Sequence, residues 1–463
     1  MTENNDTICA IATAPGVGGI AVIRISGPKA IEITGSIWKG KKLAEAATHT
    51  AHLGNIIDRE TNEVLDQGIA TVFRAPASFT GEDTVELSVH GSQWIQAQTI
   101  NLLIRNGCRL AQAGEFTRRA FASGKMDLTE AEAVADVIAA TSRASHRVAM
   151  SQMRGQFSQR LSTLRTQMLE LASLLELELD FSEEDVEFAD RKRLLDIAND
   201  TLSEVTRLAE SFATGDAIRR GVPVAIIGRP NVGKSSILNQ LLNDSRAIVS
   251  DIPGTTRDTI EDTTDIGGTV FRFIDTAGLR TTSDPVENLG IQRAWEKIAD
   301  ARIILWVITP DELSETASFL PALTTHKHPD AKIIPVINKT DLYPSHTATG
   351  IPDITAHPNV SSPLGISAKT GQGLQELRQS LIAASGTDTT TGDIIITNAR
   401  HYEALTAAAD SLRRAISGLT TTLAADLIAQ DIRETIHHLS SITGAITTPD
   451  ILSTIFSRFC IGK

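Results

Sequence analysis

Residues 222–242 combine the residue types and the spacing that phosphate binding requires. The stretch from Gly228 to Ser235 reads GRPNVGKS and matches the pattern G-x-x-x-x-G-K-[ST]. An apolar β-branched run precedes it and a helical pattern follows, which is the context in which this pattern forms a phosphate-binding loop. Glycines let backbone NH groups surround phosphate oxygens, Lys234 supplies a cation, and the Ser235 hydroxyl is a hard ligand for Mg²⁺. We therefore expect a nucleotide to bind at Asn231, Val232, Gly233, Lys234, Ser235 and Ser236.

Three further motifs follow in the order that guanine-nucleotide-binding domains show. Asp275-Thr276-Ala277-Gly278 comes after an apolar run, where an Asp can hold a metal's water shell and a Gly can turn towards the γ-phosphate. Asn338-Lys339-Thr340-Asp341 comes after another apolar run, and Ser367-Ala368-Lys369 follows it. The Asp341 carboxylate can accept two hydrogen bonds from a guanine edge, which adenine cannot donate. Together the motifs predict a GTP-binding domain.

The loop between the first two motifs offers ligands for cations. Its residues are Ser250, Asp251, Ile252, Pro253, Gly254, Thr255 and Thr256, and its paired threonines can supply a second protein hydroxyl for Mg²⁺. Asn231 has a side-chain carbonyl suited to a monovalent cation beside the phosphates. The alternative is that Asn231 only caps or shapes its loop.

The residue that positions water in Ras-like enzymes is missing. Those enzymes carry a Gln directly after the Asp-x-x-Gly motif, whereas this chain has Leu279, whose aliphatic side chain cannot orient water. The nearest carboxylate with reach in the following loop is Glu287. Its chemistry alone fits a catalytic residue and a surface charge equally well.

Length and charge restrict the remaining possibilities. A chain of 463 residues is too long for one core and suggests about three domains. Its net charge of −13 predicts weak binding of nucleic acid by this chain alone. Its three cysteines are too few and too scattered for a disulfide framework or a four-ligand zinc site. Because no apolar run approaches the ~18 residues of a membrane span, we expect a cytoplasmic protein without membrane contact.

Local patterning predicts how the chain is divided. The segments are an α+β domain at 1–120, a first helical part at 121–215, the G domain at 216–383 and a second helical part at 384–463. Twelve of the 16 prolines fall between Pro223 and Pro363, so composition changes at both ends of the G domain. These segments predict a multidomain α/β protein in which a Ras-like P-loop G domain is inserted into a discontinuous α-helical domain.

Some local features are also predicted. In the first domain, β-rich runs occupy 7–12, 20–25, 69–73 and 84–89, and one helical stretch occupies 93–106. Two polar clusters, 78–83 with Glu86 and 114–119, fit a turn and a helix cap, and the alternative is a functional role. Thr129 and Glu132 fit a capping box at the start of the helical part.

At the level of its motifs the chain resembles the tRNA modification GTPase MnmE family, also called TrmE, along its whole length. The resemblance rests on GRPNVGKSS, DIPGTTRD, DTAGLR and NKTD, on SFTGEDTVEL, GEFTRRAF and KMDLTEAEAVADVI, and on the terminal FCIGK. The first four motifs occur in many GTPases, whereas the others are far more specific.

The resemblance implies an N-terminal tetrahydrofolate-binding and dimerisation domain, a helical domain in two segments and an inserted G domain. It implies a homodimer that acts with the flavoprotein MnmG in a heterotetrameric complex. The implied reaction adds an aminomethyl-type (carboxymethylaminomethyl) group to C5 of the wobble uridine of certain tRNAs. The implied substrate is GTP, and the implied cofactors are Mg²⁺, K⁺ and 5,10-methylene- or 5-formyl-tetrahydrofolate. The G domains are implied to pair on binding GTP, and a potassium ion held by the Asn of the phosphate-binding loop and by the loop after it would act in place of an arginine finger.

The resemblance also implies roles for particular residues. It assigns potassium to Asn231, Ser250, Ile252 and Thr255, Mg²⁺ to Ser235 and Thr256, water positioning to Glu287, and folate to Arg24, Glu86, Lys125 and Lys463. A carboxylate suits the donors of a pterin, and cations suit its acidic tail. Cys460 has two interpretations, a nucleophile beside Arg458 and Lys463 or a buried thiol between Phe459 and Ile461.

Two other classes of function fit part of the sequence. One is a nucleotide-switched assembly or ribosome-binding factor with no chemistry beyond GTP. The other is a folate-dependent methyltransferase that carries a G domain. The FCIGK terminus and the folate-type first domain favour the tRNA-modifying enzyme, because a pure switch has no use for either.

Overall fold

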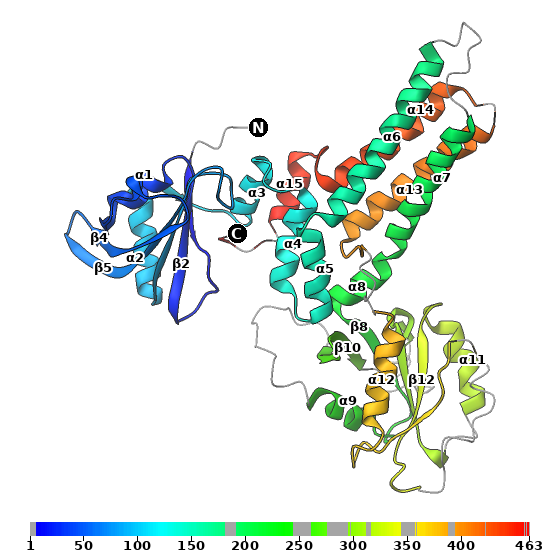
Figure 1. Ribbon diagram of the computed structural model, residues 1–463. Helices are drawn as coiled ribbons and strands as arrows, with labels where there is room; N and C mark the ends of the chain where they lie inside the picture. Colours follow the sequence, from blue (N-terminus) through cyan, green and yellow to red (C-terminus); the bar gives the residue numbers. More distant parts are fainter. Residues whose placement is uncertain are drawn as a thin grey trace, which may run out of the picture. The chain divides into compact units, whose positions relative to one another are not determined.

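The computed structural model (Figure 1) describes residues 6–180, 191–243, 261–275, 295–296, 298–311, 316–343, 357, 359–387, 394–421, 423–457, 459 and 461–462. The chain forms two compact units. The first contains Met1–Ile138, Ser151–Thr201 and Ala407–Lys463, and the second contains Ala139–Met150 and Leu202–Thr406. Within the described part of the chain, no helix combines the length and the apolarity needed to cross a membrane.

A seven-stranded sheet in the order β3-β4-β5-β6-β2-β1-β7 dominates the N-terminal part of the first unit. Its strands are β1 (Thr7–Ile11), β2 (Gly18–Ser26), β3 (Trp38–Gly40), β4 (Thr50–Asp58), β5 (Glu63–Phe73), β6 (Thr84–Gly91) and β7 (Cys108–Leu110). Neighbouring strands run antiparallel except β1 and β7, which run parallel. The four expected β-rich runs are confirmed within β1, β2, β5 and β6.

Strand alternation gives this sheet one apolar face. In β6, Val85, Leu87 and Val89 are at most 2% exposed, while Glu86 and Ser88 between them belong to the opposite face. Helices α1 (Ala30–Ser36) and α2 (Gln93–Arg105), with the short 3₁₀ helix η1 (Leu43–Glu45), bury apolar side chains in the same core.

The sequence predicted α2 but not α1. The Ile-Glu-Ile-Thr run of α1 is rich in β-branched residues, which favour strands. Burial overrides this preference, because Ile31 and Ile33 both join the core beneath the sheet. Tertiary packing, rather than local propensity, therefore stabilises α1.

Helices make up most of the chain between this sheet and the nucleotide domain, and after it. They are α3 (Glu115–Ala122), α4 (Leu128–Ala139), α5 (Arg143–Met153), α6 (Gln156–Asp180), α7 (Arg191–Glu210), α8 (Phe212–Arg220), α13 (Ala399–Thr420), α14 (Ala425–Thr443) and α15 (Pro449–Phe456). In the first unit α6 packs against α14, with an Arg433–Glu176 ion pair of 2.7 Å between them. Helical segments from before and after the nucleotide domain therefore pack together, as expected.

The capping box at the start of α4 lies two residues earlier than predicted. The Asp127 carboxylate accepts a hydrogen bond from the Glu130 backbone NH at 2.9 Å, and the Glu130 carboxylate accepts one from the Asp127 NH at 2.8 Å. The prediction of Thr129 and Glu132 was wrong, because an Asp followed three residues later by Glu satisfies the same pattern. Thr129 instead donates to Asp127 from inside the first turn.

The nucleotide domain, in the second unit, contains a six-stranded sheet in the order β13-β12-β11-β8-β10-β9. Its elements are β8 (Val222–Ile227), α9 (Lys234–Asn243), β9 (Glu261–Ile266), β10 (Thr269–Asp275), β11 (Ile303–Ile308), α11 (Thr316–His326), β12 (Lys332–Ile337), β13 (Leu364–Gly365) and α12 (Leu374–Ser385). Only β9 and β10 pair antiparallel.

Both faces of this sheet are covered. Alternate residues of β11 belong to two different apolar clusters: Ile303, Leu305 and Val307 join side chains of α9 and α12, whereas Ile304 and Trp306 join those of α11. A continuous apolar run is typical of a parallel strand buried on both faces. The largely parallel sheet covered on both faces agrees with the expected Ras-like P-loop domain.

The two ends of the nucleotide domain meet. The Ser211 hydroxyl accepts a hydrogen bond from the Ile396 NH at 3.0 Å, and a Cβ on Gly215 would collide with the Ile396 carbonyl oxygen. The chain thus enters through α8 and returns at Ile396 at one place. Adjacent ends are what an inserted domain requires.

A buried ion network holds α3 against the first sheet. The Glu115 side chain is fully buried and accepts hydrogen bonds from Arg109 at 2.6 and 3.0 Å. Arg119, also buried, bonds to Asp6 at 2.7 Å and to Glu82 at 3.2 Å. Burial alone would raise the pKa of Glu115, but the Arg109 hydrogen bonds and the Gln112 backbone NH outweigh it and hold the pKa below its ordinary value.

We predict that Glu115→Gln destabilises the first unit by about 1.5–3 kcal/mol at neutral pH, because the neutral amide cannot replace the buried carboxylate that accepts two charge-assisted hydrogen bonds from Arg109. A depressed carboxyl pKa adds stability above the unfolded value near 4.5, and this stability is lost as pH falls through the lower folded value. Urea unfolding at pH 7 and pH 4 should therefore show that the free energy of unfolding depends less on pH in the variant than in the natural chain.

The control is Glu170→Gln, which breaks an exposed pair with Arg193. Exposed pairs contribute only about 0–1 kcal/mol. Equal destabilisation by both substitutions, or an unchanged pH dependence in Glu115→Gln, would contradict the role given to the buried network.

Candidate functional site

The phosphate-binding loop joins β8 to α9 at the carboxyl edge of the parallel strands. The loop needs left-handed backbone at Asn231 (φ 65°) and Gly233 (φ 100°). A Cβ on Gly228 would collide with the Val307 carbonyl oxygen, and one on Gly233 with the Asn338 side chain. The two glycines of the motif are therefore required by close packing against neighbouring strands as well as by backbone conformation.

Lys234 and the serines after it begin α9. The Lys234 ammonium donates to the carbonyl oxygens of Gly228 and Arg229 at 2.7 and 2.9 Å, so it lies across the mouth of the loop. Ser235 and Ser236 are exposed at the first turn, where the helix dipole favours an anion. Val232 is buried and anchors the loop in the core. The loop and the first turn of α9 thus present Lys234, Ser235 and Ser236 together at one end of the helix.

Asn338 connects three loops. Its side chain is 2% exposed; Nδ2 donates to the Val232 carbonyl oxygen at 2.7 Å, and Oδ1 accepts from the Ala368 NH at 3.0 Å. The side chain thus ties the phosphate-binding loop to both predicted guanine-binding segments. All three loops leave parallel strands at the same edge of the sheet, which is where ligands bind in such folds.

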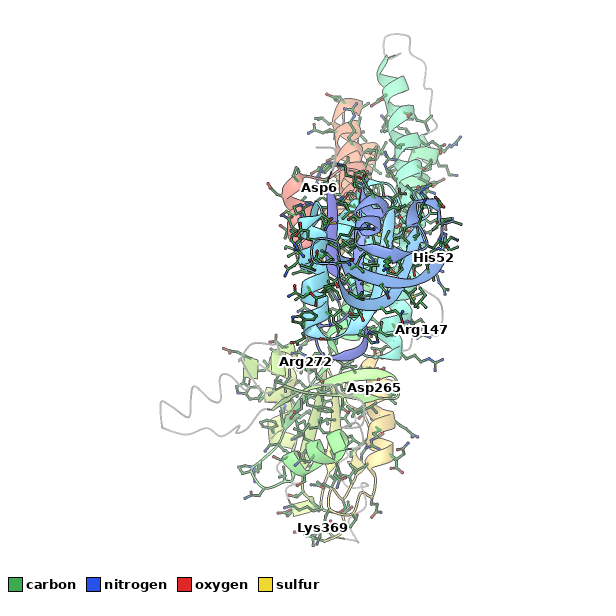
Figure 2. All side chains as sticks on the ribbon, turned by 90° about the vertical axis from the view of Figure 1, so that its left-hand side faces the viewer. Asp6, His52, Arg147, Asp265, Arg272 and Lys369 are labelled. Carbon is green, nitrogen blue, oxygen red and sulfur yellow. The ribbon has the colours of Figure 1, made fainter. Side chains whose placement is uncertain are left out.

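Asp341 is oriented by Ser367. The buried Ser367 hydroxyl donates to Asp341 Oδ1 at 2.8 Å and accepts from the Thr370 NH at 3.2 Å. The Asp341 side chain is otherwise exposed, so its carboxylate is free to accept hydrogen bonds from a ligand. Lys339 has left-handed backbone (φ 64°), and Lys369 is exposed near the tip of the domain (Figure 2).

The structure places the backbone of Asp275 at the end of β10, paired with Ile226 of β8. Its motif therefore begins at the same edge of the sheet as the phosphate-binding loop. Several predicted residues lie outside the described part of the chain: Ser250, Asp251, Ile252, Pro253, Gly254, Thr255, Thr256, Thr276, Ala277, Gly278, Glu287, Cys460 and Lys463.

Two of the predicted folate residues lie together in the first unit. Arg24 of β2 and Glu86 of β6 are cross-strand partners. The Nε and Nη2 groups of Arg24 both donate to Oε1 of Glu86, at 2.9 and 2.8 Å. They are on the sheet face opposite α1 and α2. Lys125 binds a different segment, where its ammonium donates to the Pro76 carbonyl oxygen at 3.1 Å.

The C-terminal segment reaches the same pair. The Gly462 carbonyl oxygen accepts from Arg24 at 3.4 Å, and Ile461 forms an antiparallel bridge with Ala113. A Cβ on Gly462 would collide with the Ile11 carbonyl oxygen, so this position requires glycine. Ile461 and Gly462 therefore lie beside β1 and Arg24, although the two segments are at opposite ends of the sequence.

Sequence reasoning missed two aromatic residues of this site. The Arg24 guanidinium lies 5.3 Å from the ring centroid of Phe79 and 5.7 Å from that of Phe116. Both residues belong to the polar clusters that were interpreted as a turn and a helix cap. The structure shows more than that: Glu82 of one cluster bonds to Arg119 of the other. The opposite charges of the clusters were the available signal.

Comparisons with known proteins cover nearly the whole chain. The description "GTP-binding protein TrmE N-terminus" matches residues 7–125, and "MnmE helical domain" matches residues 128–460. Proteins named tRNA modification GTPase MnmE from Christiangramia forsetii and Bacteroides fragilis are 48% and 50% identical to this chain. The alignments cover 99% of this chain and 99% and 100% of those proteins. The chain belongs to the tRNA modification GTPase MnmE family.

Proposed function

We propose that this chain is a cytoplasmic, potassium-activated GTPase that works with the flavoprotein MnmG to modify tRNA. In this proposal two copies pair, and the complex adds the carboxymethylaminomethyl group to C5 of the wobble uridine. The observation that carries the GTPase part is the Asn338 side chain, which holds the phosphate-binding loop and the guanine-binding segments in one assembly. Family membership over the full length supports the tRNA part.

The chain's own residues bind and orient the nucleotide. Backbone NH groups of the loop after β8 and the Lys234 ammonium bind the phosphates, and the Asp341 carboxylate accepts the guanine donors. The exposed Ser235 hydroxyl fits Mg²⁺ because hydroxyl oxygens are hard ligands. The exposed Asn231 side chain, on the left-handed residue of the loop, offers a carbonyl oxygen to K⁺. When bound, the two cations neutralise charge that develops on the phosphates.

Because Leu279 occupies the position at which Ras-like enzymes have a Gln, we propose that Glu287 positions the attacking water. Ser250, Ile252 and Thr255 complete the potassium ligands in this proposal, and Thr256 completes those of Mg²⁺. Pairing of two G domains would exclude water around the phosphates and so strengthen every electrostatic interaction there.

The pair Arg24–Glu86 fits a tetrahydrofolate-type ligand. A carboxylate and a guanidinium lie side by side and partly exposed, and the guanidinium also lies against two aromatic rings. Carboxylate and cation suit the donors and the acidic tail of a pterin-glutamate. We propose that Lys125 and Lys463 complete this site. When bound, the folate would supply the one-carbon unit. In this proposal Cys460 acts close to the bound folate.

The proposal is tested by mass spectrometry of wobble-position nucleosides in tRNA from cells lacking this chain. We expect the carboxymethylaminomethyl uridine to be absent and to return with the full chain but not with a chain ending at Phe459, because the tail docks beside Arg24. Unchanged nucleosides in all strains would leave only a GTP-dependent switch. Restoration by the truncated chain would remove Cys460 and Lys463 from the site.

Asn231→Leu should abolish the preference for potassium. We expect GTP hydrolysis by the natural chain to be faster in KCl than in NaCl of equal ionic strength by about tenfold or more, since arginine-finger stabilisation is worth about 10³–10⁵ in kcat. The variant should show equal rates in both salts. Asn199→Leu, on the exposed surface of α7, is the control and should keep the preference. Equal activation of the natural chain by both ions would refute the potassium mechanism.

Asp341→Asn should change the base that is bound. The amide replaces one acceptor with a donor, so two charge-assisted hydrogen bonds to guanine are weakened and GDP affinity should fall roughly 100-fold. Xanthosine diphosphate, which presents an acceptor there, should bind the variant more tightly than GDP does. Calorimetry measures both. Asp330→Asn, an exposed carboxylate before β12, is the control and should leave GDP binding unchanged.

A further inference from the structure

An arginine-rich stretch stands out in a chain of net charge −13. Residues 137–169 contain five arginines, Arg143, Arg147, Arg154, Arg160 and Arg165, and no Asp, Glu or Lys. The stretch covers all of α5 and the first turns of α6. None of the predicted nucleotide or folate residues lies within it.

The first half of α5 belongs to the second unit and presents its cations to solvent. A helix advances by about 100° per residue, which puts Arg143, His146 and Arg147 on one side. All three are exposed, whereas Ala144 and Val148 on the opposite side are buried in a cluster with Ile218 and Ile395. The apolar side thus anchors the helix, and the basic side faces outward.

A second element fixes the start of α5. The Ala144 NH donates to the Gly268 carbonyl oxygen at 3.4 Å, in the turn between β9 and β10. Figure 2 labels Asp265 and Arg272 of this hairpin and Arg147 of α5. The Asp265 carboxylate accepts a hydrogen bond from the Gly268 NH at 2.8 Å. The side chains of Arg143 and Arg147 have neither an ion pair nor a hydrogen-bond partner among the described residues.

We propose that the exposed side of α5, formed by Arg143, His146 and Arg147, binds the phosphate backbone of the tRNA. The inference rests on the proposed function, which requires a tRNA to be held by the complex. Guanidinium groups bind phosphate bidentately and are less strongly hydrated than ammonium groups, which fits a stretch whose cations are all arginines. Helices that bind membranes pair basic residues with large apolar side chains that insert; on α5 Val148 is buried, and the exposed Met153 lies in the last turn, away from Arg143.

The surface also fits the expected weakness of binding. Two or three phosphate contacts on an acidic chain give low affinity and a shallow salt dependence. Such a site orients a substrate held mainly by a partner, and backbone contacts carry no base specificity.

The test compares tRNA binding by the full chain with that by the double variant Arg143→Gln/Arg147→Gln, using fluorescence anisotropy from about 50 mM salt upward. We expect affinity to fall about tenfold at the lowest salt, and the slope of log K against log salt to shrink by about 1–2, as loss of two phosphate contacts requires. Arg143→Lys/Arg147→Lys should keep most of the salt slope, because it keeps both charges.

A matched control removes the same charge elsewhere. Arg413 and Arg433 are exposed but already paired, with Asp410 and Glu176, so Arg413→Gln/Arg433→Gln should change affinity less than twofold. The proposal would be overturned if both double variants lost tRNA affinity equally or if the α5 variant lost none. It would also be overturned if the natural chain bound no tRNA at the lowest salt.

Two parallel measurements separate this proposal from others. If the α5 variant lost binding to anionic phospholipid vesicles but kept its tRNA binding, the surface would be assigned to membranes. That result would overturn the tRNA proposal. GTP hydrolysis should be unchanged in the α5 variant, because Arg143 and Arg147 belong to no nucleotide motif and their side chains make no hydrogen bond to a described residue of one. A natural chain that hydrolyses no GTP would refute the proposed function instead, independently of the binding result.

Discussion

The nucleotide site depends on one buried amide. Asn338 uses both of its side-chain groups, one on the phosphate-binding loop and one on the backbone NH of Ala368. Leaving either group without its partner in the interior would cost about 1–3 kcal/mol, so the three loops are held together as one assembly. The same side chain leaves no room for a Cβ at position 233, which explains in packing terms why that motif residue is glycine.

The site in the first unit is held by charge instead. Arg24 is held by Glu86 across two strands and by two aromatic rings, and nearby Arg119 and Glu115 lock α3 to the sheet. Such a network tolerates polar ligands at its exposed edge, because its buried members already satisfy one another. The two units thus use different means, a neutral amide and an ion network, to fix loops that are distant in sequence.

Much of this was predictable from the sequence, and the exceptions have physical causes. Glycine spacing and apolar runs fixed the phosphate-binding loop and the parallel strands, because both signals are local. Helix α1 was missed because burial of Ile31 and Ile33 outweighs β propensity. The capping box was placed at Thr129 because two overlapping patterns satisfy the same rule. The ion network was missed because its partners, such as Arg119 and Asp6, are about a hundred residues apart in sequence and only folding brings them together.

The insertion has a consequence for synthesis of the chain. Glu176 of α6 meets Arg433 of α14, a separation of 257 residues, so a ribosome adding about 5–20 residues per second needs roughly 13–50 s to deliver the second helix after the first. The nucleotide domain, whose ends meet at Ser211 and Ile396, can complete its own core within that interval. The apolar side of α6 meanwhile remains in the nascent chain without its final partner, which makes this helix the natural target for a chaperone during translation.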